Sequence, residues 1–511
     1  MESSGVIRQK TWIGGIICLL ASIGFAFYLF SASLSNAFSP IDDHELVLHL
    51  RGQERLSISQ VTALWQRDLQ ATGRFRPLYN ILRPLELLLW GNHLNLWYLA
   101  RVILFSLSMF LCWLLLKHAV GMLFASLISS WFFTFAFWAD IIGRLGPSES
   151  YSLFGLLCWA CGLYGLYARS QQTSAWSWLL LSIGSIIAIL TKENMLIIVL
   201  PTIGITLLNR SKVYSKGLLF LPVISSFLAS FFVIRYLVRL SSVVGVDVYG
   251  NSLGVSRVSL LLDVFLDKTV LGLLLGSAIL LWFSISVPSP SWRRDFSHLC
   301  WAWITAVSLL ISQSFFYNGQ WPTNIRYDFP GMFYKLIIVV SVIFLLKRVV
   351  IDRLDNQSAR IVTLVLTCFL FLGVIRRSQI WVLRSRVQAY HQLTRSFASG
   401  LQAIKATSPS MDIILESTSI NDLEIIHAIQ VSLRQKYLAN AIYLRLHHQN
   451  TNEEGALGGQ LYTSLLQTQN DGTDVFMPLA KREAVKPCIS IFLGQETQTE
   501  CTPSSIIAVT W

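Results

Sequence analysis

Four polar residues stand together just beyond the first long apolar segment of the chain: Asp42, Asp43, His44 and Glu45. Carboxylates crowded at the edge of a membrane helix lose hydration and repel one another, unless water, a cation or a polar substrate meets them there. A carboxylate in such a place can act as a general base that removes a proton from an acceptor hydroxyl. Asp42, Asp43 and Glu45 are therefore the catalytic candidates. The alternative is a solvated loop whose acids only face water.

Basic residues in later segments are candidates for binding a phosphate. Arg74 and Arg76 alternate with aromatic and apolar residues before Trp90, a pattern typical of an interfacial amphipathic helix whose guanidinium groups face phosphates. Ordinary interfacial anchoring is the alternative. Lys192 and Glu193 stand between two short apolar segments, where a lone charge needs a partner or an anionic ligand.

Two further loops carry charges next to turns or aromatic rings. Arg144 and Glu149 flank a Gly-Pro turn, and a structural salt bridge between them is the simpler explanation. Arg326 and Tyr327 lie in an aromatic-rich loop that could also be an interfacial belt. The phosphate-binding candidates are Arg74, Arg76, Arg144, Lys192 and Arg326, and the substrate-binding candidates are Glu149, Glu193 and Tyr327.

The composition predicts an α-helical polytopic membrane protein. Of the 511 residues, 53% are hydrophobic and only 13% are charged, against roughly 25% charged residues in soluble domains. The formal net charge of +12 is expected to reflect topology signals and binding of anionic membrane lipids, and no motif indicates nucleic-acid binding. No serine-hydrolase, zinc-protease or nucleotide-binding P-loop motif occurs, and the histidines show no metal-ligand spacing.

Apolar segments close to the ~20 residues that span a bilayer recur along the chain. We predict eleven transmembrane helices near 12–33, 95–116, 119–137, 150–168, 175–190, 195–208, 217–238, 268–288, 298–315, 329–349 and 360–375. With a cytoplasmic N-terminus, every short loop on the inner side contains Lys or Arg, as the positive-inside rule requires. All the candidate residues then fall on the outer face, beginning with the first outer loop at 34–94. We expect a multi-pass protein of the cell (inner or plasma) membrane.

The chain after the last apolar segment is different in composition. We predict a transmembrane domain over 1–375, an Arg-rich amphipathic connector over 376–409 that could lie on anionic headgroups, and a small soluble α/β domain over 410–511 on the extracytoplasmic side of the membrane. In that domain Cys488 and Cys501 flank a predicted hairpin and could form a disulfide in an oxidising compartment, with free thiols as the alternative.

The order of these features resembles a known family. The first span is followed by Asp42-Asp43-His44-Glu45, then by Arg74-Phe75-Arg76-Pro77, Arg144 with Gly146-Pro147, and Thr191-Lys192-Glu193. Over about residues 12–375 the chain is similar to the GT-C superfamily of integral membrane glycosyltransferases, in its bacterial dolichyl-phosphate-mannose-protein mannosyltransferase-like and aminoarabinose-transferase-like group.

The resemblance implies a polyprenyl-phosphate-linked sugar donor, a glycan, lipid or protein acceptor, and catalysis on the extracytoplasmic face. It implies that Asp42 or Asp43 is the base, and that Lys192 and Arg326 contact the donor phosphate. The tandem acids leave open which carboxylate is catalytic and whether a divalent metal lies between them; no other cofactor is implied.

Other functions are consistent with parts of the pattern. A transporter or flippase for a lipid-linked or anionic substrate is the main alternative, although it would favour charges near the middle of spans. Arg101 and Arg235 lie near predicted span ends, where snorkelling of the side chain would accommodate them. A sensor or assembly protein would not need eleven spans as an anchor.

Overall fold

The structure is a computed structural model of the whole chain. It describes residues 3–40, 43–50, 52–70, 76–168, 175–208, 216–244, 262–263, 265–286, 290–316, 326–347, 355–375, 377–405, 412–417, 428, 442–446, 477–478, 488–493 and 506–509. Asp42, Arg74 and Cys501 lie outside these residues, and so does the side chain of Glu45.

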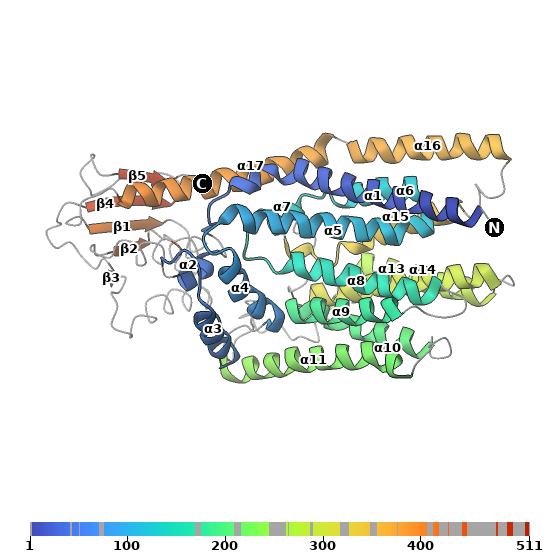
Figure 1. Cartoon of the computed structure of the whole chain (residues 1–511), viewed down its shortest axis with the longest axis horizontal. Helices are drawn as coiled ribbons and strands as arrows, with labels where there is room; N and C mark the ends of the chain where they lie inside the picture. The colour runs from blue at the N-terminus through green and yellow to red at the C-terminus, as the bar shows by residue number, and fades with distance from the viewer. Residues whose placement is uncertain are drawn as a thin grey trace.

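Most of the described chain is a bundle of helices that run along the long axis of the molecule (Figure 1). The bundle consists of α1 (Ser3–Phe30), α5 (Leu94–Val120), α6 (Met122–Phe132), α8 (Glu149–Ala168), α9 (Ala175–Thr191), α10 (Val199–Leu208), α11 (Lys216–Val244), α13 (Lys268–Ser286), α14 (Pro290–Phe316), α15 (Phe333–Leu345) and α16 (Asn356–Ile375). These segments are apolar on nearly all sides, which is typical of helices surrounded by lipid or by other helices.

Three helices in the described part of the chain are long and apolar enough to cross a membrane: Ile13–Ser35, Leu94–Val120 and Asp295–Phe315. Shorter apolar helices lie at several of the other predicted spans, among them Ala175–Thr191 and Phe333–Leu345. The structure therefore contains helices that fit a membrane, while the number of eleven spans stays a prediction.

Two predicted spans differ in detail from the helices observed. The segment 119–137 is not one helix, because α6 ends at Phe132 and a second helix, α7 (Phe137–Ile142), follows after a turn. The segment 195–208 begins as a 3-10 helix, η2 (Glu193–Ile198), directly after Lys192. Both breaks lie at the end of the bundle where the loop residues gather.

Helices α8 and α9 pack closely through glycine. A Cβ atom at Gly184 of α9 would overlap the backbone nitrogen of Trp159 in α8, and one at Gly162 of α8 would overlap the backbone nitrogen of Leu181 in α9. Small residues let two helix backbones approach in this way. This contact holds the start of α8 next to the end of α9, and both ends carry site residues.

We predict that Gly184→Val separates α8 from α9 and destabilises the protein. Overpacking of a close contact costs about 1–3 kcal/mol, and the thermal melting temperature in detergent measures the effect. Gly272→Val in α13 is the matched control, because nothing lies within 4 Å of a Cβ atom placed there. Equal melting temperatures for the two variants would contradict a close contact.

Three short helices cover the end of the bundle at which α5 and α8 begin. They are α2 (His44–Leu50), α3 (Ile58–Gln70) and α4 (Pro77–Leu89) (Figure 1). They share a small core with the start of α5. Leu50, Leu87 and Trp97 are buried in this core. Pro77 occupies the first turn of α4, where its missing N–H would have no partner in any case. These helices therefore anchor the predicted first outer loop to the bundle.

The predicted amphipathic connector is a single long helix, α17 (Arg377–Lys405). One face packs against the bundle, with Leu383, Val387 and Phe397 buried. Near its middle, His391 Nδ1 lies 3.0 Å from Asn36 Oδ1, and Thr394 Oγ1 accepts a 3.3 Å hydrogen bond from the backbone of Ala37. This part of α17 is therefore docked on protein rather than only on headgroups.

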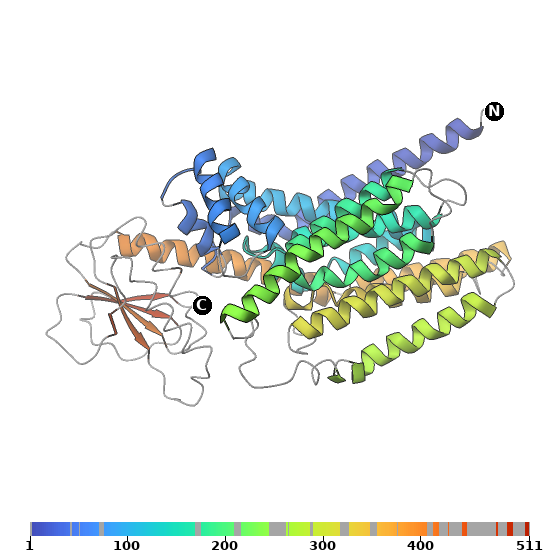
Figure 2. The same cartoon turned by 90° about the horizontal axis from the view of Figure 1, so that it is seen from below.

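The C-terminal region contains a five-stranded parallel sheet in the order β3-β2-β1-β4-β5. The strands are β1 (Asp412–Ser417), β2 (Ile442–Leu446), β3 (Met477–Pro478), β4 (Cys488–Leu493) and β5 (Ile506–Val509). The sheet lies beyond the end of the bundle that carries α2 to α4, in both views (Figures 1 and 2). Between β1 and β2 the structure describes Ala428, which is helical and buried.

The predicted hairpin between Cys488 and Cys501 is wrong. Strands β4 and β5 pair in parallel, and parallel neighbours need a crossover connection rather than a tight turn. The alternation of apolar residues that predicted the two strands carries no information about their relative direction. The disulfide itself falls outside the described residues and stays a prediction.

Candidate functional site

The loop between α7 and α8 is the centre of the candidate site. The carboxylate of Asp43 accepts hydrogen bonds from the backbone N–H groups of Leu145 at 2.9 Å, Gly146 at 2.8 Å and Ser39 at 2.9 Å. Asp43 is completely buried. Its carboxylate therefore connects the predicted first outer loop to the predicted second one, and these bonds hold it in a fixed position.

Other residues hold the same loop from different sides. Arg101 Nη2 donates to the carbonyl oxygen of Leu145 at 2.8 Å and a second nitrogen of its guanidinium contacts Ser150. Tyr79 donates to the carbonyl oxygen of Gly146. Arg101 is 2% exposed, so the predicted snorkelling of its side chain is wrong. The arginine turns inward because buried loop carbonyls offer it acceptors that satisfy its donors.

Lys192 and Glu149 form a buried ion pair beneath this loop. Lys192 is fully buried, Glu149 is 3% exposed, and the ammonium contacts the Glu149 carboxylate. Burial alone would raise the pKa of Glu149, but the positive charges of Lys192, Arg326 and Arg76 outweigh it and lower the pKa to about 2. The ends of α8 and α9 are thus joined by opposite charges that water does not screen.

Arg76 reaches the same place from the start of α4. Its Nε atom lies 3.1 Å from Glu193 Oε2, and its Nη1 atom donates to Ser148 Oγ at 3.0 Å. The side chain of Arg76 is 15% exposed, in contrast to the fully enclosed Lys192. Arg76 is therefore a cation of this cluster that a solute or a lipid phosphate can still approach.

Asp140 organises the other side of the cluster. Its carboxylate contacts Arg144 and the hydroxyl of Tyr390, and it accepts a 2.9 Å hydrogen bond from the backbone N–H of Arg326. Burial would raise the pKa of Asp140, but the charge of Arg144 and the bonds from Tyr390 and Arg326 lower it. Asp140 thus joins three segments that are far apart in the sequence.

Sequence reasoning missed Asp140 and Tyr390. Asp140 precedes Arg144 by four residues, which is the spacing of neighbours on one helical turn, so the pair was open to recognition. Tyr390 gave no comparable signal, because its helix was predicted from periodicity alone. The predicted salt bridge between Arg144 and Glu149 is also wrong, since Arg144 pairs with Asp140 and Glu149 pairs with Lys192.

The structure brings together the predicted site residues that it describes. These residues come from four predicted outer loops and are Asp43, Arg76, Arg144, Glu149, Lys192, Glu193, Arg326 and Tyr327. Arg326 is half-buried and its guanidinium lies over the ring of Tyr327, 5.1 Å from the ring centre. We call these residues, together with Asp140, the loop cluster. Asp42 and Arg74 adjoin it in sequence but lie outside the described residues.

The arrangement of the loop cluster limits what each cation can do. Lys192 is enclosed and paired, so any ligand would feel it only through its electric field or after a local rearrangement. Arg76 and Arg326 keep part of their surface accessible. Among the described residues, no group of three or more His, Cys, Asp or Glu side chains is placed to hold a metal ion.

A second pair of buried charged residues lies on α4, next to the loop cluster. Arg83 Nη1 lies 3.1 Å from Glu86 Oε2, and the guanidinium of Arg83 lies 4.7 Å from the ring centre of Tyr79. Glu86 also accepts a hydrogen bond from Tyr151 of α8. Burial raises the pKa of Glu86 from 4.5 to about 7, because it outweighs the charge of Arg83. Glu86 therefore gains or loses a proton near neutral pH.

We predict that this titration makes stability depend on pH. Because the pKa of Glu86 is higher in the folded state, its stabilising contribution is complete below about pH 4.5 and is lost as the pH rises through about 7. The loss amounts to about 3 kcal/mol. Melting temperatures from pH 5 to 8.5 should fall more steeply for the wild type than for Glu86→Gln, which keeps an acceptor for Tyr151. If the melting temperatures of the wild type and Glu86→Gln change equally with pH, Glu86 is not the titrating group.

No protein-family model matches the chain, and no curated protein sequence matches it.

Proposed function

We propose that the protein is a membrane glycosyltransferase that moves a sugar from a polyprenyl-phosphate donor to an acceptor outside the cytoplasm. The observation that carries the proposal is the loop cluster: acids and cations from four separate loops meet at one end of an apolar helical bundle. Charges are rarely gathered at the end of such a bundle without a charged or polar ligand. The likeness of the motif order to GT-C enzymes supports the same reading.

The roles follow from the accessibility of the side chains. Arg76 and Arg326, which are partly exposed, contact the donor phosphate, and Lys192 adds positive charge from beneath. Asp43 is a positioning residue, because its carboxylate already accepts three backbone hydrogen bonds. Its neighbour Asp42 is then the general base.

The reaction forms one bond to the anomeric carbon of the sugar and breaks another. The acceptor hydroxyl loses its proton to Asp42 while its oxygen bonds to the anomeric carbon of the sugar, and the bond from that carbon to the phosphate oxygen breaks. Positive charge develops on the sugar ring and negative charge on the leaving phosphate. Fixed cations in a poorly hydrated place stabilise that negative charge without reorganisation.

The test is a transfer assay on the full-length protein purified in detergent. Polyprenyl phosphates that carry radiolabelled hexoses or pentoses are supplied with glycan, lipid and protein acceptors, and nucleotide sugars serve as control donors. We expect transfer from a polyprenyl phosphate only. Movement of the lipid-linked sugar across proteoliposomes without transfer would instead support the flippase alternative and overturn the proposal.

A further inference from the structure

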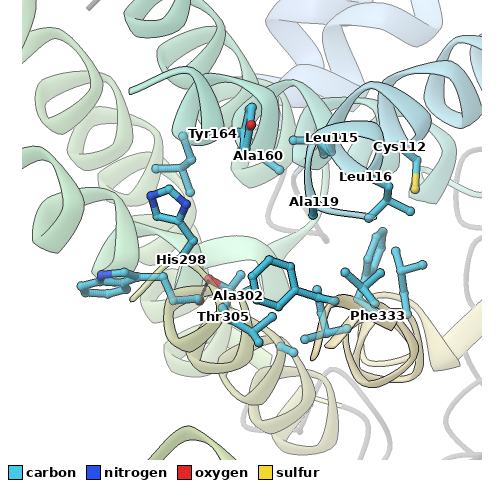
Figure 3. Close-up of a pocket in the computed structure, with 18 of the residues that line it drawn as sticks. Cys112, Leu115, Leu116, Ala119, Ala160, Tyr164, His298, Ala302, Thr305 and Phe333 are labelled. Carbon is cyan, nitrogen blue, oxygen red and sulfur yellow. Dashed lines mark hydrogen bonds between the residues drawn. The ribbon is translucent and has the colours of Figure 1, made fainter. Parts of the chain in front are cut away.

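A cavity of about 550 Å³ lies inside the bundle between α5, α8, α14 and α15. Figure 3 shows Leu115 and Leu116 of α5 and Ala160 of α8 on one side, with Ala302 of α14 and Phe333 of α15 opposite. The volume is within the range of about 300–1,000 Å³ that is typical of small-molecule sites. Because the walls are mainly alkyl and aromatic, a hydrocarbon chain suits the cavity better than a polar solute.

The two ends of the cavity have different chemistry. Its charged and imidazole side chains are His118 near the end of α5, Asp295 and His298 near the start of α14, and Lys347 just after α15. All four belong to helix ends that lie opposite the loop cluster, because α5 and α8 begin at the cluster and end here. The charged end of the cavity is therefore on the other face of the bundle, which the Lys and Arg pattern predicts to be cytoplasmic.

The end of the cavity that points toward the loop cluster is apolar. Leu156 of α8, Leu309 of α14 and Phe333 of α15 line it. An occupant that satisfies both ends has a polar head at the cytoplasmic face and a hydrocarbon chain that extends toward the middle of the membrane. This is the shape of a membrane lipid.

Charge at the mouth selects the head group. Within the part of the chain that the structure describes, no hydrogen bond or ion pair engages the ammonium of Lys347. The ring of His118 stacks on Tyr164 with 5.2 Å between ring centres, so its orientation is set beside the mouth. Basic residues at a cytoplasmic membrane face attract anionic head groups. Asp295 is the one carboxylate and Lys347 the one lysine or arginine among the described residues that line the cavity. A neutral imidazole at His118 can still donate an N–H to a phosphate oxygen.

We propose that this cavity holds one acyl chain of an anionic phospholipid from the cytoplasmic leaflet, with the lipid phosphate at Lys347 and His118. The donor lipid of the proposed reaction is a poorer occupant. Its phosphate belongs at the loop cluster, so its chain would enter from the apolar end and leave the ammonium of Lys347 at the mouth without a phosphate. The phospholipid site is thus separate from the proposed active site, and the two proposals fail independently.

The test is native mass spectrometry of the full-length protein released from nanodiscs of phosphatidylcholine with phosphatidylglycerol. Lys347→Glu reverses the charge at the mouth, and Ala160→Phe fills the cavity. Arg360→Glu is the matched control, because Arg360 is an exposed cation near the start of α16 at the same end of the bundle and does not line the cavity. Melting temperatures confirm that each variant is folded, and Lys347→Glu suffices if Ala160→Phe does not fold.

We expect the wild type and Arg360→Glu to retain phosphatidylglycerol in preference to phosphatidylcholine. Lys347→Glu should weaken retention about tenfold, and Ala160→Phe should abolish it. Equal retention by Lys347→Glu and the wild type would overturn the proposal. So would displacement of the phospholipid by an equimolar polyprenyl phosphate, because the cavity would then hold the donor chain.

Discussion

Asp42→Asn should reduce sugar transfer by about 10²–10⁴-fold, which is the usual contribution of a general base. Asparagine cannot take the proton of the acceptor hydroxyl, but it has almost the same shape as aspartate. The melting temperature should therefore change little, and binding of the polyprenyl-phosphate donor should persist. Rates of transfer, measured with saturating donor, check this. If Asp42→Asn transfers sugar at the wild-type rate, Asp42 is not the base.

Asp43→Asn is the matched control for that result. Its amide group would place N–H donors against backbone N–H groups that now donate to the carboxylate, and an unsatisfied buried donor costs about 1–3 kcal/mol. We expect Asp43→Asn to lower both the melting temperature and the activity. A stable Asp43→Asn variant without activity would instead make Asp43 the base and Asp42 its neighbour.

Lys192→Met should be among the most destabilising substitutions in the described chain. It leaves the Glu149 carboxylate buried without its nearest cation, and breaking a buried pair from one side costs about 3–5 kcal/mol. The pKa of Glu149, now about 2, should rise, so that the variant is most stable at acidic pH. Thermal melting in detergent at pH 5 and pH 8 measures both effects.

The double variant Glu149→Leu with Lys192→Met tests whether the unpaired carboxylate of Glu149 causes the loss of stability in Lys192→Met. Replacing both charges by apolar groups of similar size removes the uncompensated charge, so the double variant should regain most of the melting temperature that Lys192→Met loses. Transfer activity should stay low, because the positive charge beneath the phosphate is gone. A double variant as unstable as Lys192→Met would mean that Lys192 stabilises the fold through packing alone.

Hydrophobic periodicity and composition predicted where the long helices lie in the sequence. The apolar stretch at 95–116 corresponds to α5 (Leu94–Val120), and the one at 175–190 to α9 (Ala175–Thr191). Long apolar segments can satisfy their backbone groups only as helices in lipid, so local sequence decides their form. The break after Phe132 was not predicted, because the aromatic residues on both sides are as apolar as the helix itself.

Pairing between charges was less predictable. Arg144 and Glu149 looked like partners because they are near in sequence, yet each finds a closer partner elsewhere: Asp140 one turn away, and Lys192 across the contact between α8 and α9. The position of Lys192 depends on how tightly those two helices pack, which depends on glycine. Such contacts between distant segments leave little trace in one sequence.

The amino-acid sequence by itself determined that the chain forms apolar helices and that its unusual acids and cations occupy the loops between them, because burial of apolar surface and hydration of charge act on each segment separately. The tertiary structure alone decided that Asp43 holds the loop before α8, that Lys192 is enclosed rather than open to a ligand, and that Tyr390 contacts Asp140 of the loop cluster. Those outcomes depend on distances between segments, which are set only when the helices pack.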